Sequence, residues 1–212
     1  MKIPRFVKPD GSLVVQLEKL GLLMGNRGVL RPSHFEHPQP CAPGKGWLTC
    51  VVKRDGQPIE KTPVDYTKLF MLDEVTAFAA GHRPCYSCQR QRYNEFVDVW
   101  EKATGYDREE IDSVLTSERC DEEGKKRVFE APLGGLPNGV FVRVPGSEQS
   151  AMLLWGKLFP WSIEGYQSPI KPAHNIQVQV LTPKSIVLMF AKGFPLPVNR
   201  DETIHPSVLN YV

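Results

Sequence analysis

The chain of 212 residues is long enough for one large domain or two small ones, and a hydrophobic content of 41% argues against a disordered protein. A net charge of +2 means that any nucleic-acid function would need a local basic patch. The five cysteines are an odd number, which fits a metal site with additional thiols better than a disulfide scaffold. No apolar run is long enough to cross a membrane, and the N-terminus lacks the apolar segment of a signal peptide. We therefore expect a cytoplasmic protein without membrane contact.

The first residues predict a hairpin arm that runs into a short helix. Pro9-Asp10-Gly11 is a turn signal, and apolar residues follow it over positions 13–23. Glycines at 25 and 28 would end the helix. Residues 31–46 are rich in proline and have no hydrophobic periodicity, which predicts a loop. The possible metal ligands in this loop are His34, Glu36, His37 and Cys41.

A strand and a hairpin are predicted next. Residues 47–52 (WLTCVV) have the composition of a strand, and residues 54–56 (RDG) are typical of a hairpin turn. Residues 57–61 would then form the returning strand. This hairpin precedes the segment that carries most of the chemistry.

Residues 72–96 predict two short helices separated by a Pro-Cys-x-x-Cys turn. Asp73 can cap the first helix, Gly81 can end it, and Pro84 prevents its continuation. Cys85 and Cys88 then fall at the expected start of the second helix. There, free backbone N–H groups and the helix dipole favour the thiolate form.

The second helix is expected to continue to Gly105, because apolar residues follow it with helical spacing. Asp107, with Glu110 three residues later, is typical of a capping box and predicts a further helix to about residue 120. From residue 133 the pattern changes to β-structure, as in the alternating IQVQVL at 176–181. Thr182 is expected to cap a last helix, with Pro183 at its first position.

The fold class predicted from these elements is α+β. A change of composition near residues 125–135 divides the chain into a metal-binding region, 1–130, and a β-rich region, 131–212. The alternative is that both regions share one core.

Metal chemistry is indicated by the cysteines. Cys85 and Cys88 have the spacing of one zinc knuckle, and a closed tetrahedral zinc site needs two further ligands. Cys50, on the predicted strand, is the third candidate, and Cys41 is the fourth, although these two are spaced more widely than usual. The residues that compete with Cys41 for the fourth position are His34, His37 and His82. Otherwise, Cys50 would be a small buried hydrophobe.

The segment AFAAGHRPCYSC resembles the end of the zinc-binding domain of Ada-type DNA repair proteins. In those domains a β-hairpin carries the first cysteine pair, and an A-x-A-A-G-(F/Y)-R-P-C-x-x-C segment carries the second. The similarity covers roughly residues 47–92 and extends to uncharacterised bacterial proteins with NRG, W-x-x-C and AAGHRPC blocks. It implies an Ada-like hairpin and helix that bind Zn²⁺ through Cys50, Cys85 and Cys88, with Arg83 matching the arginine before Pro-Cys.

One departure from the Ada-type pattern bears on function. Those domains carry a methyl-accepting cysteine four residues after the first ligand, and this position is Arg54 here. The resemblance therefore implies a structural zinc ion rather than suicide methyl transfer.

The first functional hypothesis is a zinc-stabilised protein associated with DNA or RNA, in repair or processing. The candidate nucleic-acid-binding residues are Arg54, Arg83, Arg90 and Arg92. Tyr86 and Tyr93 could stack on bases. On charge alone, these residues would be an ordinary solvated helix face.

Three alternatives remain open. A zinc-dependent deaminase of nucleobases would use H-x-E and P-C-x-x-C, found here at residues 34–36 and 84–88, but prolines 38 and 40 prevent the helix that H-x-E requires. A redox pair at Cys85 and Cys88 would normally follow a strand, whereas a helix is predicted before it. A structural or interaction protein with a purely structural zinc ion is the third. The sequence identifies no catalytic residue, substrate, protein partner or oligomeric state.

Overall fold

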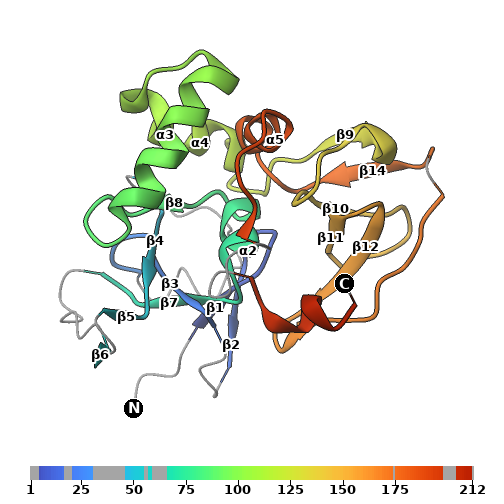
Figure 1. Cartoon of the computed structure of the whole chain (residues 1–212), viewed down its shortest axis with the longest axis horizontal. Coiled ribbons are helices and arrows are strands. Elements are labelled where there is room, and N and C mark those ends of the chain that lie inside the picture. The colour runs from blue at the N-terminus through green and yellow to red at the C-terminus, as the bar shows by residue number, and fades with distance from the viewer. Residues whose placement is uncertain are drawn as a thin grey trace.

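The computed structural model describes residues 5–16, 21–30, 46–54, 57–58, 66–173, 175–197 and 204–211. These residues form two six-stranded sheets, a short hairpin and the helices α2 to α5 (Figure 1). The predicted α+β class is confirmed at this level. No helix in the described part of the chain is both long and apolar enough to cross a membrane.

The first sheet is built from the N-terminal part of the chain, in the order β2-β1-β7-β3-β4-β8. Its strands are β1 (Arg5–Val7), β2 (Leu13–Val15), β3 (Leu23–Asn26), β4 (Leu48–Val51), β7 (Leu69–Met71) and β8 (Arg83–Pro84). Neighbouring strands are antiparallel except for the parallel pairs β1–β7 and β4–β8. The predicted hairpin around residues 9–11 is β1–β2, and Gly11 adopts a positive φ of 86° in its turn.

Two predictions in this region had different outcomes. The short helix expected before Gly25 is wrong for residues 23–26, which form β3, because β3 pairs with both β4 and β7 and this tertiary pairing outweighs local preference. The hairpin expected at residues 54–56 is confirmed by the antiparallel pair β5 (Lys53–Arg54) and β6 (Gln57–Pro58). Its turn residues and the rest of its returning strand lie outside the described residues.

Helix α2 (Glu74–Ala79) lies between the two sheets, and all of its residues are buried (Figure 1). As predicted, the Asp73 carboxylate caps it by accepting a hydrogen bond from the Thr76 N–H at 2.9 Å. Gly81 ends it at a φ of 86°, and the His82 N–H returns to the Ala77 carbonyl at 2.9 Å, which completes a Schellman motif. The N-terminal cap at Asp73 and the C-terminal cap at Gly81 therefore fix both ends of α2, the helix that precedes the cysteine pair.

The predicted start of the second helix is wrong. The backbone N–H group of Arg83 donates to the carbonyl of Trp47, just before β4, at 2.9 Å, and that of Cys85 donates to the carbonyl of Thr49 on β4 at 3.0 Å. This segment therefore extends the sheet. Helix α3 (Arg90–Thr104) begins only after the turn that contains both cysteines. Cys85 and Cys88 consequently lie at the edge of a sheet and not in the first turn of a helix.

Helices α4 and α5 follow the predicted positions, but the cap of α5 differs. The capping box of Asp107 and Glu110 is present and leads through η1 (Arg108–Glu110) into α4 (Ile111–Arg119). The Thr182 hydroxyl does not cap α5 (Lys184–Ala191), because it accepts a hydrogen bond from the Phe141 N–H at 2.9 Å. The Glu118 carboxylate of α4 binds the Ser185 N–H instead, at 3.0 Å. A residue 67 positions away thus stabilises the first turn of α5.

The second sheet is built from residues 129–180. Its strands follow the order β13-β12-β11-β10-β14-β9, and all neighbours are antiparallel. They are β9 (Phe129–Pro132), β10 (Phe141–Arg143), β11 (Ala151–Leu154), β12 (Lys157–Ser162), β13 (Gly165–Tyr166) and β14 (Gln177–Val180). The other short helices are η2 (Leu133–Gly135) and η4 (Pro206–Tyr211).

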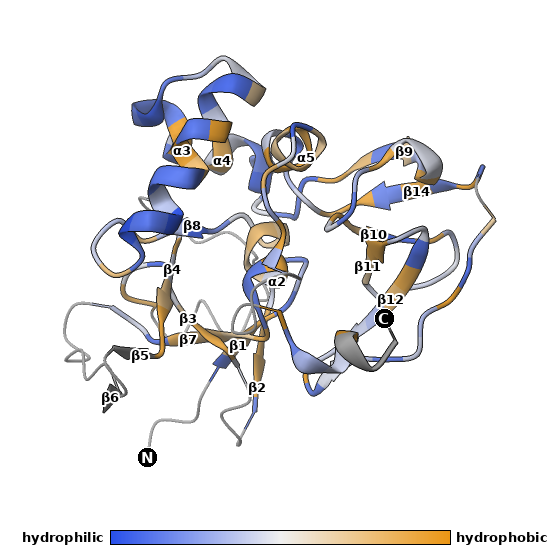
Figure 2. Ribbon diagram, in the orientation of Figure 1, coloured by the Kyte–Doolittle hydropathy of each residue, from blue (hydrophilic) through white to orange (hydrophobic). Residues whose placement is uncertain are grey.

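Hydrophobic residues of both halves pack in common clusters. Phe78, Phe96 and Trp100 from the N-terminal half contact the same cluster as Val180 and Met189 from the C-terminal half. A second cluster joins α2 to the C-terminal sheet, and a third joins α2 to the N-terminal sheet. Figure 2 shows hydrophobic residues along α2 and the strands next to it, whereas α3 carries many hydrophilic residues. Cys50 and Cys85 belong to a separate small cluster with Met24 at the edge of the N-terminal sheet.

Candidate metal centre

Three thiols meet at the edge of the N-terminal sheet. The Sγ atoms of Cys50, Cys85 and Cys88 all lie within 4.8 Å of one another. Cys50 and Cys85 are buried and Cys88 is half-buried. Thiolates bound to one tetrahedral zinc ion at about 2.3 Å have sulfur atoms about 4 Å apart, so this cluster can hold a single metal ion.

The pairing of β4 with β8 brings these thiols together. Cys50 lies on β4, next to Thr49, whose carbonyl accepts a hydrogen bond from the Cys85 N–H at 3.0 Å. The side-chain amide of Gln89 also donates to the Thr49 carbonyl, at 2.9 Å. The Gln89 N–H donates to the Cys85 carbonyl at 2.9 Å and closes the turn between the two cysteines. The cluster is thus held by backbone geometry at both ends of the turn.

The three sulfur atoms strongly influence one another. Hydrogen bonds from the Cys50 and Cys88 thiols lower the pKa of Cys85, and the backbone N–H groups of Cys88 and Ser87 contribute in the same direction. The pKa of Cys50 is raised because its thiol donates to the sulfur atoms of Cys85 and Cys88, and burial adds to this effect. Cys85 therefore ionises more readily than Cys50, and a bound cation would favour ionisation of all three thiols.

His82 does not belong to this cluster, which corrects its candidacy as the fourth ligand. The imidazole is fully buried, and its Nε2 accepts a hydrogen bond from the Arg27 Nε at 3.1 Å. Its ring packs against Trp47, with 5.0 Å between the ring centroids. The other candidates for the fourth position, Cys41, His34 and His37, lie outside the described residues.

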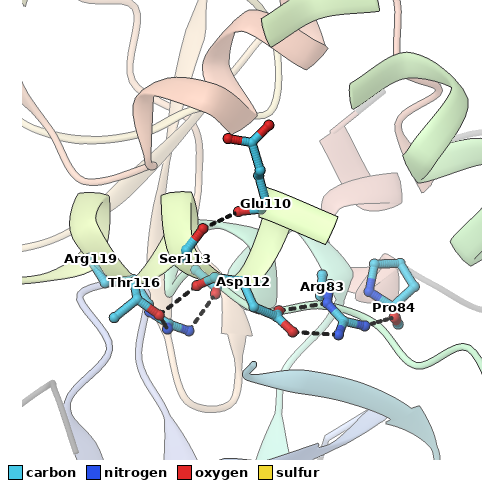
Figure 3. Close-up of polar contacts among 8 residues, drawn as sticks. Arg83, Pro84, Glu110, Asp112, Ser113, Thr116 and Arg119 are labelled. Atoms are coloured by element: carbon cyan, nitrogen blue, oxygen red, sulfur yellow. Dashed lines mark hydrogen bonds and ion pairs between the residues drawn. The ribbon is translucent and has the colours of Figure 1, made fainter. Parts of the chain in front are cut away.

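The arginines that were predicted to bind nucleic acid have different surroundings. Arg83 makes two hydrogen bonds of 2.7 Å to the Asp112 carboxylate on α4 (Figure 3). Arg92 is only 7% exposed and makes hydrogen bonds of 2.9 and 2.7 Å to the buried Glu74 carboxylate. Arg90 is exposed. The backbone of Arg54 lies on β5, and its side chain is outside the described part.

An aromatic and basic surface adjoins the cysteines. Tyr86, which follows Cys85 in the sequence, is 48% exposed. Its ring makes an edge-to-face contact with that of Tyr93, with 5.3 Å between the ring centroids. The Arg90 guanidinium lies 4.5 Å from the centre of the Tyr86 ring, and the Arg83 guanidinium lies 5.5 Å from that of Tyr93. We call these four residues the Tyr86 surface.

The sequence interpretation missed two residues that support this region. Asp112 orients Arg83 from 29 residues away, and no local pattern indicates this pairing. Gln89 follows Cys88 directly, and its position after the cysteine pair is the only signal that could have identified it. Both residues act by holding the turn and its neighbours and not by contact with the thiols.

No protein-family model, curated protein or solved structure shows significant similarity to the chain. The geometry of the site is therefore the basis for assigning a function.

Proposed function

We propose that this protein binds one Zn²⁺ ion through Cys50, Cys85 and Cys88 and that the zinc-stabilised Tyr86 surface binds single-stranded DNA or RNA. The observation that carries the proposal is the convergence of three thiols within 4.8 Å. Thiolate ligands favour zinc among the common divalent ions, and the positive charge would remove the repulsion that keeps these thiols from ionising together. The resemblance to Ada-type zinc-binding domains points to the same three ligands.

The fourth position would be taken by water or by a side chain outside the described residues. A fourth protein ligand would make the site purely structural, whereas water would leave a reactive position. We do not propose methyl transfer, because Arg54 replaces the acceptor cysteine. We do not propose deamination either, because prolines 38 and 40 prevent the helix that its H-x-E motif requires. Glu36, the carboxylate of that motif, lies outside the described residues.

The nucleic-acid role rests on the Tyr86 surface. Bases stack on exposed aromatic rings, and guanidinium groups next to those rings add attraction for phosphate. Because Tyr86 lies between Cys85 and Cys88, a bound zinc ion would restrict the turn that carries its ring. Arg92 is not part of this surface, since its guanidinium is buried against Glu74.

Metal analysis of the purified full-length chain tests the zinc site. We expect one zinc ion per chain and its loss in Cys50→Ser, Cys85→Ser and Cys88→Ser. Thiol titration should detect Cys50, Cys85 and Cys88 only after chelation, whereas a redox pair at Cys85 and Cys88 would become reactive only on reduction. The thiols that reduction releases from the disulfide of Cys120 are counted separately by peptide mapping. The zinc content of Cys41→Ser shows whether Cys41 is the fourth ligand. A wild-type protein that binds no zinc would refute the proposal.

Fluorescence anisotropy with single-stranded DNA and RNA tests the second part. Binding should weaken steeply with salt, and Tyr86→Ala should weaken it about tenfold, since stacking contributes roughly 1–3 kcal/mol per base. Arg90→Ala should also reduce affinity. Lys102→Ala removes an exposed charge from the last turn of α3 and should have little effect. Absence of binding at low salt would exclude this role and leave the zinc assignment intact.

A further inference from the structure

A second group of charged residues lies in the interior around Trp47. The guanidinium carbon atoms of Arg27 and Arg119 are 3.6 and 4.1 Å from the centre of the Trp47 ring, and the two residues are only 5% and 3% exposed. Lys126 is half-buried, and its ammonium group donates to the Ala79 carbonyl at 2.9 Å. We call Arg27, Arg119 and Lys126 the cationic cluster.

These three cations have only neutral hydrogen-bond acceptors in the described part of the chain. Arg27 donates to the Gly11 carbonyl at 2.7 Å and to His82. Arg119 donates to the Gly81 carbonyl at 3.1 Å and to the Thr116 hydroxyl, which is visible beside it on α4 (Figure 3). Asp10 and Asp112 are the carboxylates near enough to act on the cluster electrostatically. Both are already engaged, Asp10 by Arg143 and Asp112 by Arg83, each at 2.7 Å.

The cluster therefore carries an excess of buried positive charge. Burial lowers the pKa of Lys126 to about 7 and that of Arg119 to about 10, and the pKa of Arg27 is also lowered, by burial and by Arg119. Uncompensated buried charges are costly, and proteins normally pair them. A counter-ion from solution would provide the missing negative charge.

Unused hydrogen-bonding atoms point to the same place. Arg27 Nη2, His82 Nδ1 and Trp47 Nε1 are buried and make no hydrogen bond within the described residues. These three residues contact one another, through the Arg27–His82 hydrogen bond and the packing of both on Trp47. Buried polar atoms without partners are rare in proteins, and three on mutually contacting residues suggest an acceptor that binds there.

A route from solvent reaches part of this group. Trp47 and Arg119 line a cavity of about 850 Å³ that is bounded by α4, residues 120–129 and the start of α5. Arg127 and Lys184 add positive charge to its wall. The acidic residues on the wall are Glu118, Asp121, Glu122 and Glu123. Glu118 is bound to Ser185 and Asp121 to the Lys125 N–H, while Glu122 and Glu123 are exposed.

We propose that the cationic cluster is an oxyanion site that binds a phosphate group, with Arg27, Arg119 and Lys126 as its charged ligands. Two guanidinium groups and an ammonium group supply the charge and the donors that a tetrahedral dianion requires. The phosphate is either free inorganic phosphate or part of a small phosphorylated molecule that extends into the cavity. The site is separate from the metal centre and does not depend on the proposed zinc or nucleic-acid role.

Thermal unfolding and calorimetry on the full chain, purified without phosphate or sulfate, test this site. Inorganic phosphate should raise the melting temperature progressively, and chloride at equal ionic strength should not. Lys126→Gln keeps a donor for the Ala79 carbonyl but removes one charge, so it should weaken phosphate binding at least tenfold. Lys125→Gln is the matched control, because Lys125 is the exposed neighbour and should respond like the wild type. Arg119→Gln provides a second variant if Lys126→Gln folds poorly.

The two sources of phosphate are distinguished by a second titration with a nucleoside monophosphate. Tighter binding than that of inorganic phosphate would support a small phosphorylated ligand, and equal or weaker binding would support the free ion. The proposal fails if millimolar phosphate produces neither a thermal shift nor binding heat. It also fails if Lys125→Gln and Lys126→Gln reduce the response equally, since the effect would then be general surface electrostatics.

Discussion

The guanidinium of Arg92 is buried beside Glu74, whereas that of Arg90, two residues earlier, is exposed beside Tyr86. Arg83 is different again, because the Asp112 carboxylate accepts hydrogen bonds from its Nε and Nη2 atoms. From their positions in the sequence alone, Arg83, Arg90 and Arg92 are predicted to form one basic patch. Their surroundings leave Arg90 as the exposed cation and give Arg92 a structural role.

Lys126 leads to a prediction of pH dependence at the residue scale. Burial lowers its pKa from 10.5 to about 7 in the folded protein, so that between pH 7 and 10.5 the unfolded chain binds more protons than the folded one. Stability must therefore rise with pH in this window, by roughly 1–3 kcal/mol when the incomplete burial of Lys126 is allowed for. The charged groups that act on Lys126 are Asp10, Arg27, Arg119 and Arg143.

Urea unfolding in phosphate-free buffer at pH 7 and at pH 9.5 checks this dependence. Lys126→Gln should lose most of the gain in stability, because the titrating group has been removed. Lys125→Gln should keep it, since the exposed Lys125 carries no comparable burial cost. Equal pH dependence in both variants would contradict the assignment to Lys126.

At the scale of elements, α2 organises the molecule. It packs against both sheets, its capping Asp73 also accepts a hydrogen bond from the Tyr166 hydroxyl at 2.9 Å, and its Glu74 binds Arg92 of α3. The same arginine donates to the Pro195 carbonyl at 2.8 Å. A single buried ion pair thus connects α2 and α3 with the segment that follows α5.

Breaking this ion pair should destabilise the protein strongly. Arg92→Met would remove the cation paired with the buried Glu74 carboxylate, and we expect a loss of about 3–5 kcal/mol in the free energy of unfolding. Arg90→Met, on the exposed side of the same helix, should change stability by less than about 0.5 kcal/mol. Chemical denaturation of the two variants gives the comparison. Similar stability of both variants would show that the Glu74–Arg92 pair does not join the helices.

At the scale of the whole molecule, the proposed metal would act on one edge of the N-terminal sheet. The thiol cluster joins β4 to the turn before α3, while the C-terminal sheet is held by its own strand pairing and by the shared core. Metal loss should therefore weaken one region more than the rest. The large core allows the remainder of the fold to persist, unlike small zinc domains that unfold without metal.

Removal of zinc with a chelator should lower the melting temperature and increase amide exchange selectively. We expect faster hydrogen exchange in residues 47–51 and 83–93 and little change in β10, β11 and β14. Mass spectrometry of peptides before and after chelation measures this difference. Uniform loss of protection would indicate that the metal supports the entire fold, and unchanged protection would argue against a structural metal.

Much of the secondary structure could be predicted because it depends on neighbouring residues. The Asp73 cap, the left-handed Gly81 and the capping box at Asp107 involve contacts over three to five positions, and these signals were interpreted correctly. The prediction that Cys85 and Cys88 lie close together also depended only on their spacing in the sequence. The alternation of residues 176–181 also predicted a strand that buries Val178 and Val180.

Tertiary structure decided the features that depend on residues far apart in the chain. Helix α3 begins later than predicted because β8 pairs with β4. The Thr182 hydroxyl accepts a hydrogen bond from the Phe141 N–H, so Glu118 caps α5 in its place. The sequence by itself determined the elements with local signals, such as the capped α2 and the alternating strand β14, and suggested which thiols can bind a metal. Only the packing of these elements decided which thiols meet, which arginines are buried and where positive charge accumulates, because burial and electrostatics depend on distances in space.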